Sequence, residues 1–450
     1  MVPRSHRIAC VAALGVAAAP GWAARDAWDV ENTGQPTVDA EFTVTEGTWM
    51  SVDVSPDGQT LAFDLLGDLY TLPAAGGEAR LVHGGSSMER DPRFSPDGKR
   101  LLYISDRSGG DNVWVSNVDG SDAHPITAET VNSLTGPTWG PNGAFIAAAR
   151  LFSTDDKLHA SELRLFALAG GSGRLLVPAP ANGENVHEPQ FSRDGRYLYY
   201  TEKVSPPTRS VVYIDANHIN YAIMRRDLRS GTTEELIKGF GSATTPELAP
   251  DGWHLAFIRR VQAKTVLFLY DLQTGEQRPI YDGLDRDSQA DFIWQGIYYP
   301  QYGWFSDSRH VVIWAKGKLW KIDMITAAVA EIPFRVKARH RITLPPRFSH
   351  DLAPSIFKVR AIRQLAYSPD GRTVVFNALG RLWRKSLPAG QPVRLTKSTS
   401  LEFEPAFSPD GKLIAYVEWN DERGGLLKLA AMDGRSSRTL AASGGVLRAP

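Results

Sequence analysis

Three acidic residues recur in one sequence context, each directly before a proline and three residues before a phenylalanine. They are Asp91, Glu188 and Glu404, and His187 stands beside Glu188. If the surrounding segments are arranged around a common axis, these side chains meet near that axis. A ring of carboxylates attracts a cationic group or a metal ion. The simpler alternative, which we favour, is that each acid satisfies a turn or pairs with a nearby arginine such as Arg90.

The residue patterns that usually carry catalysis are missing from the sequence. There is no Gly-x-Ser-x-Gly elbow, no His-Glu-x-x-His helix and no Gly-x-x-x-x-Gly-Lys phosphate loop. No two of the ten histidines are separated by a single residue, so no His-x-His metal strand is present. We therefore predict no catalytic residue, no metal ligand and no cofactor. Asp91, His187, Glu188 and Glu404 are candidates for binding a ligand or partner at the mouth of a channel.

A repeated sequence motif predicts the strands that position these residues. The tetrapeptide Ser-Pro-Asp-Gly, or a degenerate form of it, occurs eight times, beginning at residues 55, 95, 140, 192, 249, 306, 368 and 408. The intervals of 40 to 62 residues are typical of a propeller or a solenoid. Short β-branched and aromatic runs follow each turn, and four such strands fit into one unit. The sequence therefore predicts an all-β propeller of about eight four-stranded blades, or seven because the sixth turn lacks its glycine.

The tetrapeptide has a mechanical explanation. Proline presets φ for a tight turn, aspartate can accept a hydrogen bond from the local backbone, and glycine takes the positive φ that closes the hairpin. We expect each turn to join the inner strand of a blade to its second strand, with a structural aspartate. Trp114, Trp320 and Trp383 recur on the third strand, and we interpret them, together with Trp49, as blade core.

Four long segments enlarge the third to sixth units, and either binding or the covering of blade edges explains them. They are Thr154–Ala160, Ser205–Asn220, Tyr281–Tyr299 and Arg335–Phe357. The last of them carries a basic run made of Arg335, Lys337, Arg339, His340 and Arg341. We expect this run to be a solvated loop, with docking to an acidic partner as the alternative.

The N-terminus has the features of a secretory signal peptide. Arg4 and Arg7 precede an apolar stretch over residues 8–20, and small residues permit cleavage near Ala23. The only cysteine, Cys10, lies inside this signal, so the mature chain has none. Cleavage leaves 48 of the 50 basic residues against 50 acidic ones, so the mature chain lacks the basic excess typical of nucleic-acid binders.

The repeat and the signal together predict the domain organisation. Residues 1–23 are the signal, residues 24–46 are an N-terminal segment in which Glu41–Thr45 adds a ring-closing strand, and residues 47–450 are the propeller. Val446–Pro450 resembles the start of a further repeat, at which we expect the chain to be truncated. No later segment has eighteen uninterrupted apolar residues, so we expect no membrane span and a periplasmic or secreted product.

The repeat resembles that of a known family. Pro92–Lys99 and Pro405–Lys412 are similar to the WD-like propeller repeat of TolB, the periplasmic propeller of the Tol-Pal system. A narrower similarity, carried by Gly47–Gly58 and Phe63–Pro73, is to the N-terminal propeller of large exported amidohydrolases. In those proteins, a metal-dependent barrel with a His-x-His strand follows the propeller. This chain has no such motif, so the resemblance implies the propeller alone.

These observations lead to three functional hypotheses. The first is an exported, non-catalytic propeller that serves as a scaffold or binding module for a protein, a peptide or an amidohydrolase barrel absent from this chain. The second is a hydrolase with a site in the propeller channel or on a missing domain, which leaves open whether the full protein is an enzyme. The third is a TolB-like partner in protein interactions of the cell envelope.

Overall fold

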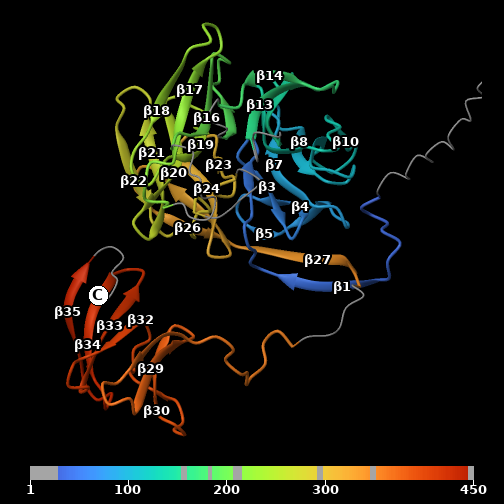
Figure 1. The fold of residues 1–450 in the computed structure, drawn as a ribbon. Coiled ribbons are helices and arrows are strands. Elements are labelled where there is room, and N and C mark those ends of the chain that lie inside the picture. Colours follow the sequence, from blue (N-terminus) through green and yellow to red (C-terminus); the bar gives the residue numbers. More distant parts are fainter. Residues whose placement is uncertain are drawn as a thin grey trace, which may run out of the picture. The chain divides into compact units, whose positions relative to one another are not determined.

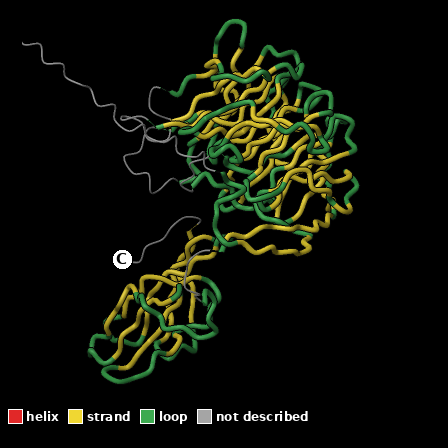
Figure 2. The backbone as a smooth tube through the Cα atoms, turned by 90° about the vertical axis from the view of Figure 1, so that its right-hand side faces the viewer, coloured by secondary structure: helices red, strands yellow, loops and turns green. Residues whose placement is uncertain are grey.

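The computed structural model describes residues 29–153, 160–180, 185–205, 215–290, 297–344 and 351–443. The predicted signal peptide and the C-terminal end at Val446–Pro450 lie outside these ranges. The chain divides into two compact units, Met1–Leu344 and Pro345–Pro450, and each is described by itself. The described residues form strands and turns (Figure 2), and among them no helix has the length and apolar character needed to cross a bilayer.

The first unit contains six four-stranded antiparallel sheets, called blades 1 to 6, in the described residues (Figure 1). From the inner to the outer strand, blade 1 consists of β2 (Val52–Val54), β3 (Thr60–Leu65), β4 (Asp68–Pro73) and β6 (Arg80–His83), and blade 2 of β7 (Glu89–Phe94), β8 (Arg100–Ser105), β9 (Asn112–Asn117) and β10 (His124–Pro125). In the same order, blade 3 consists of β11 (Ser133–Trp139), β12 (Phe145–Phe152), β13 (Ala160–Ala167) and β14 (Arg174–Val177), and blade 4 of β15 (Val186–Phe191), β16 (Tyr197–Lys203), β17 (Tyr221–Asp227) and β18 (Thr233–Ile237). Blade 5 consists of β19 (Thr244–Leu248), β20 (His254–Val261), β21 (Lys264–Asp271) and β22 (Gln277–Tyr281), and blade 6 of β23 (Gly303–Trp304), β24 (His310–Ala315), β25 (Lys318–Asp323) and β26 (Val329–Ile332).

The repeated tetrapeptide forms the turn between the first two strands of a blade, as predicted. In blade 1, Asp57 Oδ1 accepts hydrogen bonds from Ser55 Oγ at 2.6 Å and from the Gln59 amide at 3.0 Å. The Gly58 amide donates to the Ser55 carbonyl at 2.8 Å, with φ of 73° at the glycine. Since the aspartate is occupied by its own turn, the prediction that it is structural is confirmed.

The first unit closes on itself with six blades. The Val52 amide of blade 1 donates to the Gln301 carbonyl beside blade 6 at 2.9 Å, and Gln301 N donates to Ser51 Oγ at 3.3 Å. The turns meet at the same junction, because a Cβ on Gly58 would lie 3.2 Å from Ser306 Oγ. A closed ring leaves no blade face uncovered, which is how propellers protect their sheets.

The second unit contains two further four-stranded sheets, called blades 7 and 8. They are β28 (Arg363–Tyr367), β29 (Thr373–Ala378), β30 (Arg381–Ser386) and β31 (Val393–Arg394), and β32 (Leu401–Phe407), β33 (Leu413–Asn420), β34 (Gly424–Ala431) and β35 (Ser437–Ser443). The described residues thus hold eight blades, the number predicted from the eight turns. The correction concerns their grouping, since six blades close a ring and two belong to a separate unit.

A three-stranded sheet lies outside the blades. It consists of β1 (Thr37–Val44), β27 (Phe334–Thr343) and the short β5 (Gly77–Glu78), with β27 in the middle. The prediction that Glu41–Thr45 closes the ring is wrong, because β1 pairs along its whole length with β27 rather than with a blade.

The basic run also differs from its prediction, because it is part of strand β27 rather than a loop. Phe334, Val336 and Ala338 are buried, while the intervening Arg335 and Lys337 are exposed. A strand presents alternate residues to opposite faces, so the even-numbered positions pack into the core and the cations face outward.

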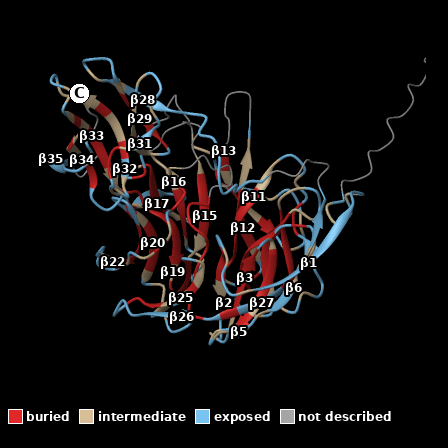
Figure 3. Ribbon diagram, turned by 90° about the horizontal axis from the view of Figure 1, so that it is seen from below, coloured by how far each residue is buried: buried red, intermediate tan, exposed pale blue. Residues whose placement is uncertain are grey.

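Facing blades bury their apolar side chains against one another. The second strand of blade 1, β3, is buried from Leu61 to Leu65 (Figure 3). The corresponding strands of blades 2 and 6 show the same pattern. Each fully buried leucine or phenylalanine contributes roughly 1.5–3 kcal/mol to folding. Trp114 is buried as predicted, whereas Trp49 is partly exposed and lies against Trp314 at the rim of the core.

Candidate functional site in the channel of the first unit

Equivalent residues of the six inner strands surround the axis of the first unit. The sixth turn is Phe305–Ser308, one residue earlier than the sequence predicted, because the Ser308 amide donates to the Phe305 carbonyl. Four positions before each turn begins stand the residues that we call the upper layer, Ser51, Asp91, Gly136, Glu188, Thr245 and Gln301. In blades 2 to 5, this residue has a positive φ of 52–59° at a break in the strand register. A β-bulge of this kind re-aims a side chain. Glu404 has the same conformation, but it belongs to blade 8 of the second unit.

Asp91 is engaged on all sides by its own fold. Its Oδ1 accepts a hydrogen bond from Ser51 Oγ at 2.9 Å, and its Oδ2 pairs with Arg90 Nη1 at 3.0 Å. Its backbone amide donates to Asp64 Oδ2 at 2.9 Å. The carboxylate is buried and joins blade 1 to blade 2, which is the role that pairing with Arg90 implies.

Asp64 is a buried acid that the sequence analysis missed. It accepts the Ser51 amide at 3.0 Å in addition to the Asp91 amide. Burial, with a further contribution from the negative charge of Asp91, raises the pKa of Asp64 to about 8. Its sequence signal is an aspartate inside the otherwise apolar strand β3, where a polar residue needs dedicated partners.

Glu188 is held by four donors between blades 4, 5 and 6. Its carboxylate accepts from Thr201 Oγ1 at 2.6 Å, from the Thr245 amide at 2.7 Å, from Thr245 Oγ1 at 2.9 Å and from the Tyr298 amide at 3.4 Å. Burial raises the pKa of Glu188 to about 7, although these hydrogen bonds favour the ionised form. This side chain therefore ties neighbouring blades together.

His187 lies beside Glu188 as a neutral ring. Its Nε2 is 3.4 Å from Ser161 Oγ, and the ring packs edge-on against Tyr298 with centroids 5.9 Å apart. Burial lowers the pKa of His187 to about 3, so the imidazole stays uncharged at neutral pH. Its Nδ1 is buried without a hydrogen-bond partner among the described residues.

The described parts of the segment Tyr281–Tyr299, residues 281–290 and 297–299, reach the upper layer through Tyr298. Its described part is anchored by Asp287, which accepts from Arg260 Nε at 2.8 Å and from Thr265 Oγ1 at 2.7 Å. Tyr298, from the same segment, contacts both Glu188 and His187. These described residues thus pack against blades 4 and 5.

A second layer, which we call the lower layer, lies two residues nearer the turns. It contains Asp53, Arg93, Thr138, Gln190, Glu247 and Gly303, one from each blade. The Arg93 guanidinium forms an ion pair with Glu247, donates to the Tyr302 carbonyl at 3.1 Å and lies 3.6 Å from Asp53 Oδ1. Gln190 Nε2 also donates to Glu247, at 3.1 Å.

The lower layer lines a pocket of about 210 Å³ at the turn end of the axis, which we call the channel pocket. Its wall is completed by Trp139 and Trp304, whose indole N–H groups donate to the Arg93 carbonyl at 3.1 Å and to the Glu247 carbonyl at 2.9 Å. All six blades contribute to this wall, so the pocket exists only because the ring is closed.

The electrostatics of the channel pocket favour a cationic group. Burial raises the pKa of Glu247 to about 7 against the opposing effect of Arg93, and burial also raises the pKa of Asp53. Two carboxylates face one guanidinium, so one negative charge is uncompensated when both are ionised. The Nε of Arg93 is buried and has no acceptor among the described residues.

The pocket residues were missed because only the acids before proline were considered. Arg93 and Gln190 stand two positions after Asp91 and Glu188 in the repeat. Within the described ranges, no group of three or more His, Cys, Asp or Glu side chains could hold a metal ion. The arrangement places two carboxylates and one guanidinium on the wall of one pocket.

Comparison with known proteins shows that part of this chain is similar to TolB-type β-propellers. Residues 32–203 match a family model described as PD40, TolB beta propeller domain. An uncharacterized protein of Agrobacterium fabrum is 28% identical over 155 residues, which cover 32% of this chain and 52% of that protein. The Tol-Pal system protein TolB of Helicobacter hepaticus is 25% identical over 178 residues, covering 38% of this chain and 42% of TolB.

The matched regions thus span about half or less of these relatives. Among solved structures, the tricorn protease aligns over 88% of this chain and 35% of its own, with 12% identity and a TM-score of 0.45. An oligogalacturonate lyase of Vibrio parahaemolyticus aligns over 87% of this chain and 98% of its own, with 14% identity and a TM-score of 0.37.

Proposed function

We propose that this chain is an exported, non-catalytic propeller that binds a protein or peptide partner at the turn end of the channel. The observation that supports the proposal is the channel pocket, in which the carboxylates of Glu247 and Asp53 outnumber the single guanidinium of Arg93. The partner would place a lysine or arginine side chain there. The upper-layer acids Asp91 and Glu188 would hold the ring together rather than touch the partner.

The chemistry of the pocket suits such a side chain. An ammonium or guanidinium group would neutralise the uncompensated carboxylate in a site walled by all six blades. The indoles of Trp139 and Trp304 offer apolar surface to the aliphatic part of the side chain. A glutamate side chain would instead add a third negative charge, so the pocket would discriminate by charge.

Binding of short peptides tests this proposal. Peptides that differ only in a central lysine, glutamine or glutamate are compared by fluorescence polarisation, and the lysine peptide should bind at least about tenfold more tightly. Glu247→Gln should abolish that preference, whereas Glu276→Gln, at an exposed acid of the β21–β22 turn, should keep it. Equal binding of the lysine and glutamine peptides would contradict the proposal.

The pH dependence gives a second test of the same site. Glu247 has a pKa of about 7 in the folded chain, so its charge is lost as the pH falls through that value. Binding of the lysine peptide should therefore weaken between pH 8 and pH 6 and become independent of pH in Glu247→Gln. A pH dependence that survives the substitution would assign the titration to another group.

Two alternative biological settings are proposed for this chain. The family-model match and the TolB relative favour a TolB-like protein of the cell envelope that works through protein contacts. The similarity of Gly47–Gly58 to exported amidohydrolases favours a propeller attached to a metal-dependent barrel. The coding region after the Pro450 codon distinguishes them, because an open frame that encodes a His-x-His strand supports the amidohydrolase and a stop codon contradicts it.

A further inference from the structure

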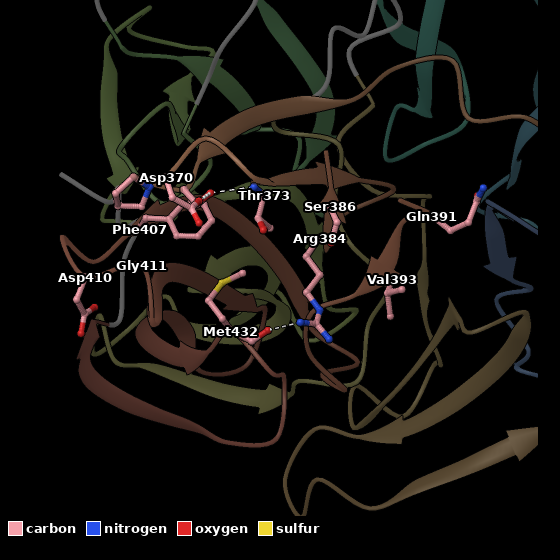
Figure 4. A pocket seen from close by; sticks show the side chains of 12 residues that line it. Asp370, Thr373, Arg384, Ser386, Gln391, Val393, Phe407, Asp410, Gly411 and Met432 are labelled. Carbon is pink, nitrogen blue, oxygen red and sulfur yellow. Dashed lines mark hydrogen bonds between the residues drawn. The ribbon is translucent and has the colours of Figure 1, made fainter. Parts of the chain in front are cut away.

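A cavity of about 430 Å³ lies between blades 7 and 8 of the second unit, and the protein itself occupies its polar groups (Figure 4). Arg384 Nη1 donates to the Met432 carbonyl at 2.7 Å. Asp370 and Asp410 each accept a hydrogen bond from the serine of their own turn, at 2.7 and 2.6 Å. Each charged side chain of this cavity thus has a partner within the fold.

A second cavity between the same two blades, of about 450 Å³, has a different character, and we call it the basic cavity. It is lined by the loop that follows β31, by residues of β33 and β34, by the turn between those two strands and by the β34–β35 turn. All its lining residues belong to the second unit. Among them are four cations and one carboxylate, namely Lys397, Arg423, Lys428, Arg435 and Glu418.

Most of this positive charge is not neutralised by the protein. Lys428 Nζ pairs with the buried Glu418 at 3.0 Å. The side chains of Lys397 and Arg423 have no ion pair or hydrogen bond among the described residues. Arg435 has a long, exposed pair at 3.8 Å with a carboxylate of its own turn. The four cations therefore exceed the one carboxylate of the cavity by three charges.

A buried hydroxyl without a partner also lines the basic cavity. Tyr416 is fully buried, and its Oη makes no hydrogen bond among the described residues. The Ser437 hydroxyl opposes the rise in the pKa of Tyr416 that burial causes, but it does not have the geometry of a hydrogen bond to it. A buried polar group without a partner costs stability, so its position on a cavity wall indicates that a ligand satisfies it.

The corresponding space between blades 1 and 2 is filled by a histidine. Tyr103 stands five residues after its turn glycine, like the unpartnered tyrosine of blade 8, and the His83 ring packs on it with centroids 5.0 Å apart. His83 Nε2 lies 2.9 Å from Ser116 Oγ. At the equivalent positions of blades 7 and 8 stand Thr396 and Ala430, both of which line the basic cavity. Two smaller side chains thus leave this space open in the second unit.

The loop from blade 7 to blade 8 supplies hydroxyl groups in a fixed arrangement. The Ser398 carbonyl accepts from Arg394 Nη2 at 3.1 Å, and the Thr399 carbonyl accepts from Arg381 Nη2 at 2.7 Å. The Ser400 amide donates to Ser398 Oγ at 3.1 Å. Serines of the β34–β35 turn add further hydroxyls to the wall. A loop that is held before binding loses less conformational entropy when a ligand arrives.

We propose that the basic cavity binds a small polyhydroxylated compound that carries a phosphate group, such as a sugar phosphate. A phosphate monoester has close to two negative charges at neutral pH, which the excess of cations neutralises. Arginine and lysine side chains form strong, charge-assisted hydrogen bonds to phosphate oxygens. The volume of about 450 Å³ is typical of small-molecule sites, so the hydroxyl groups of the wall have room to bind a polar body beyond the phosphate.

Isothermal titration calorimetry of the full-length protein in a phosphate-free buffer tests the proposal. Glucose 6-phosphate should bind with one site per chain and at least about tenfold more tightly than inorganic phosphate, while glucose alone should give no binding heat. Absence of binding of glucose 6-phosphate at millimolar concentration would overturn the proposal. Equal affinities for glucose 6-phosphate and inorganic phosphate would overturn the assigned ligand class.

Charge-removing variants test whether the basic cavity is the site of that binding. Arg423→Gln and Lys397→Gln alter exposed side chains and should each weaken the binding of glucose 6-phosphate at least about tenfold. Lys412→Gln is the matched control, because Lys412 is an exposed lysine of blade 8 that does not line the cavity, and its affinity should equal that of the wild type. Unchanged affinity in both Arg423→Gln and Lys397→Gln would contradict the proposed site.

Tyr416→Phe distinguishes a ligand-binding role of the buried hydroxyl from a structural one. Since the Oη has no partner within the described fold, its removal should not lower the melting temperature. The same variant should bind glucose 6-phosphate about fivefold more weakly, because the ligand loses a hydrogen bond. A Tyr416→Phe variant that binds as tightly as the wild type would show that the ligand does not reach this hydroxyl and would contradict the proposal.

Discussion

Ser51 Oγ donates a hydrogen bond of 2.9 Å to Asp91 Oδ1, and the two residues occupy the same position in successive blades. Thr245 and Glu188 repeat this relationship between blades 5 and 4, with Thr245 Oγ1 at 2.9 Å from the carboxylate. Both bonds are buried beside the axis of the first unit. Since a buried carboxylate needs donors, each acid makes the position of the neighbouring blade specific.

Glu188→Gln should destabilise the first unit. The amide would place an N–H group where the carboxylate accepts hydrogen bonds from Thr201 and Thr245, which leaves a buried donor unsatisfied. We expect the free energy of unfolding to fall by about 1–3 kcal/mol. Urea denaturation at pH 8 measures the change, and the exposed substitution Glu276→Gln should produce almost none. An equal loss in both variants would show that the Glu188 contacts contribute nothing specific.

Asp64 should make the folded state less stable as the pH rises, which is the opposite of what a carboxyl group with a lowered pKa does. The pKa of Asp64 is raised from 3.8 to about 8, so the folded state keeps a proton that the unfolded state loses. The free energy of unfolding should therefore fall as the pH rises between those two values, by at most about 1.4 kcal/mol per pH unit for one group.

Asp64→Asn provides the measurement, because an asparagine does not titrate. Denaturation between pH 5 and pH 8 should give a flatter dependence in Asp64→Asn than in the wild type. Asp57→Asn is the matched control, since the pKa of Asp57 is lowered by its turn hydrogen bonds and its charge does not change in this range. An unchanged slope in Asp64→Asn would contradict the assignment.

Arg93→Met should be among the most damaging single substitutions in the channel. It removes the partner of Glu247 and leaves two buried carboxylates facing each other, which costs about 3–5 kcal/mol for a broken buried ion pair. Adding Glu247→Met to this variant should restore part of the loss. Arg339→Met breaks the exposed pair with Asp39 at 2.8 Å and should cost far less stability than Arg93→Met, since solvent screens exposed charges. Additive effects of Arg93→Met and Glu247→Met in calorimetry would exclude their coupling.

Alanine substitutions at two turn glycines distinguish the stability cost of backbone strain from the cost of disturbing a contact between blades. Gly98 and Gly252 have φ of 71° and 76° at equivalent turn positions, but only Gly98 lies against a neighbouring proline. Gly252→Ala should cost about 1 kcal/mol from the left-handed conformation alone. Gly98→Ala should cost about 1 kcal/mol more, because Pro56 must shift. Thermal unfolding of both variants provides the comparison, and equal losses would mean that the turn contact contributes no stability.

Much of the fold could be predicted from local sequence signals. The turn around Asp57 is specified within six residues, because the serine, the aspartate and the glycine satisfy one another. The four-stranded blades follow from such turns and from the apolar runs between them. The equivalence of Asp91 and Glu188, which both lie within inner strands, could also be inferred, since the repeat aligns them.

The closure at six blades and the channel pocket were decided by tertiary structure. Ser51 meets Gln301 although 250 residues separate them, and Arg93 pairs with Glu247 across 154 residues. Because the blades share one repeat, their packing surfaces are similar. The local sequence pattern therefore does not indicate which two blades meet where the ring closes. That choice depends on the summed packing of all blades, and only the closed ring brings Arg93, Glu247 and Asp53 out of water into one pocket.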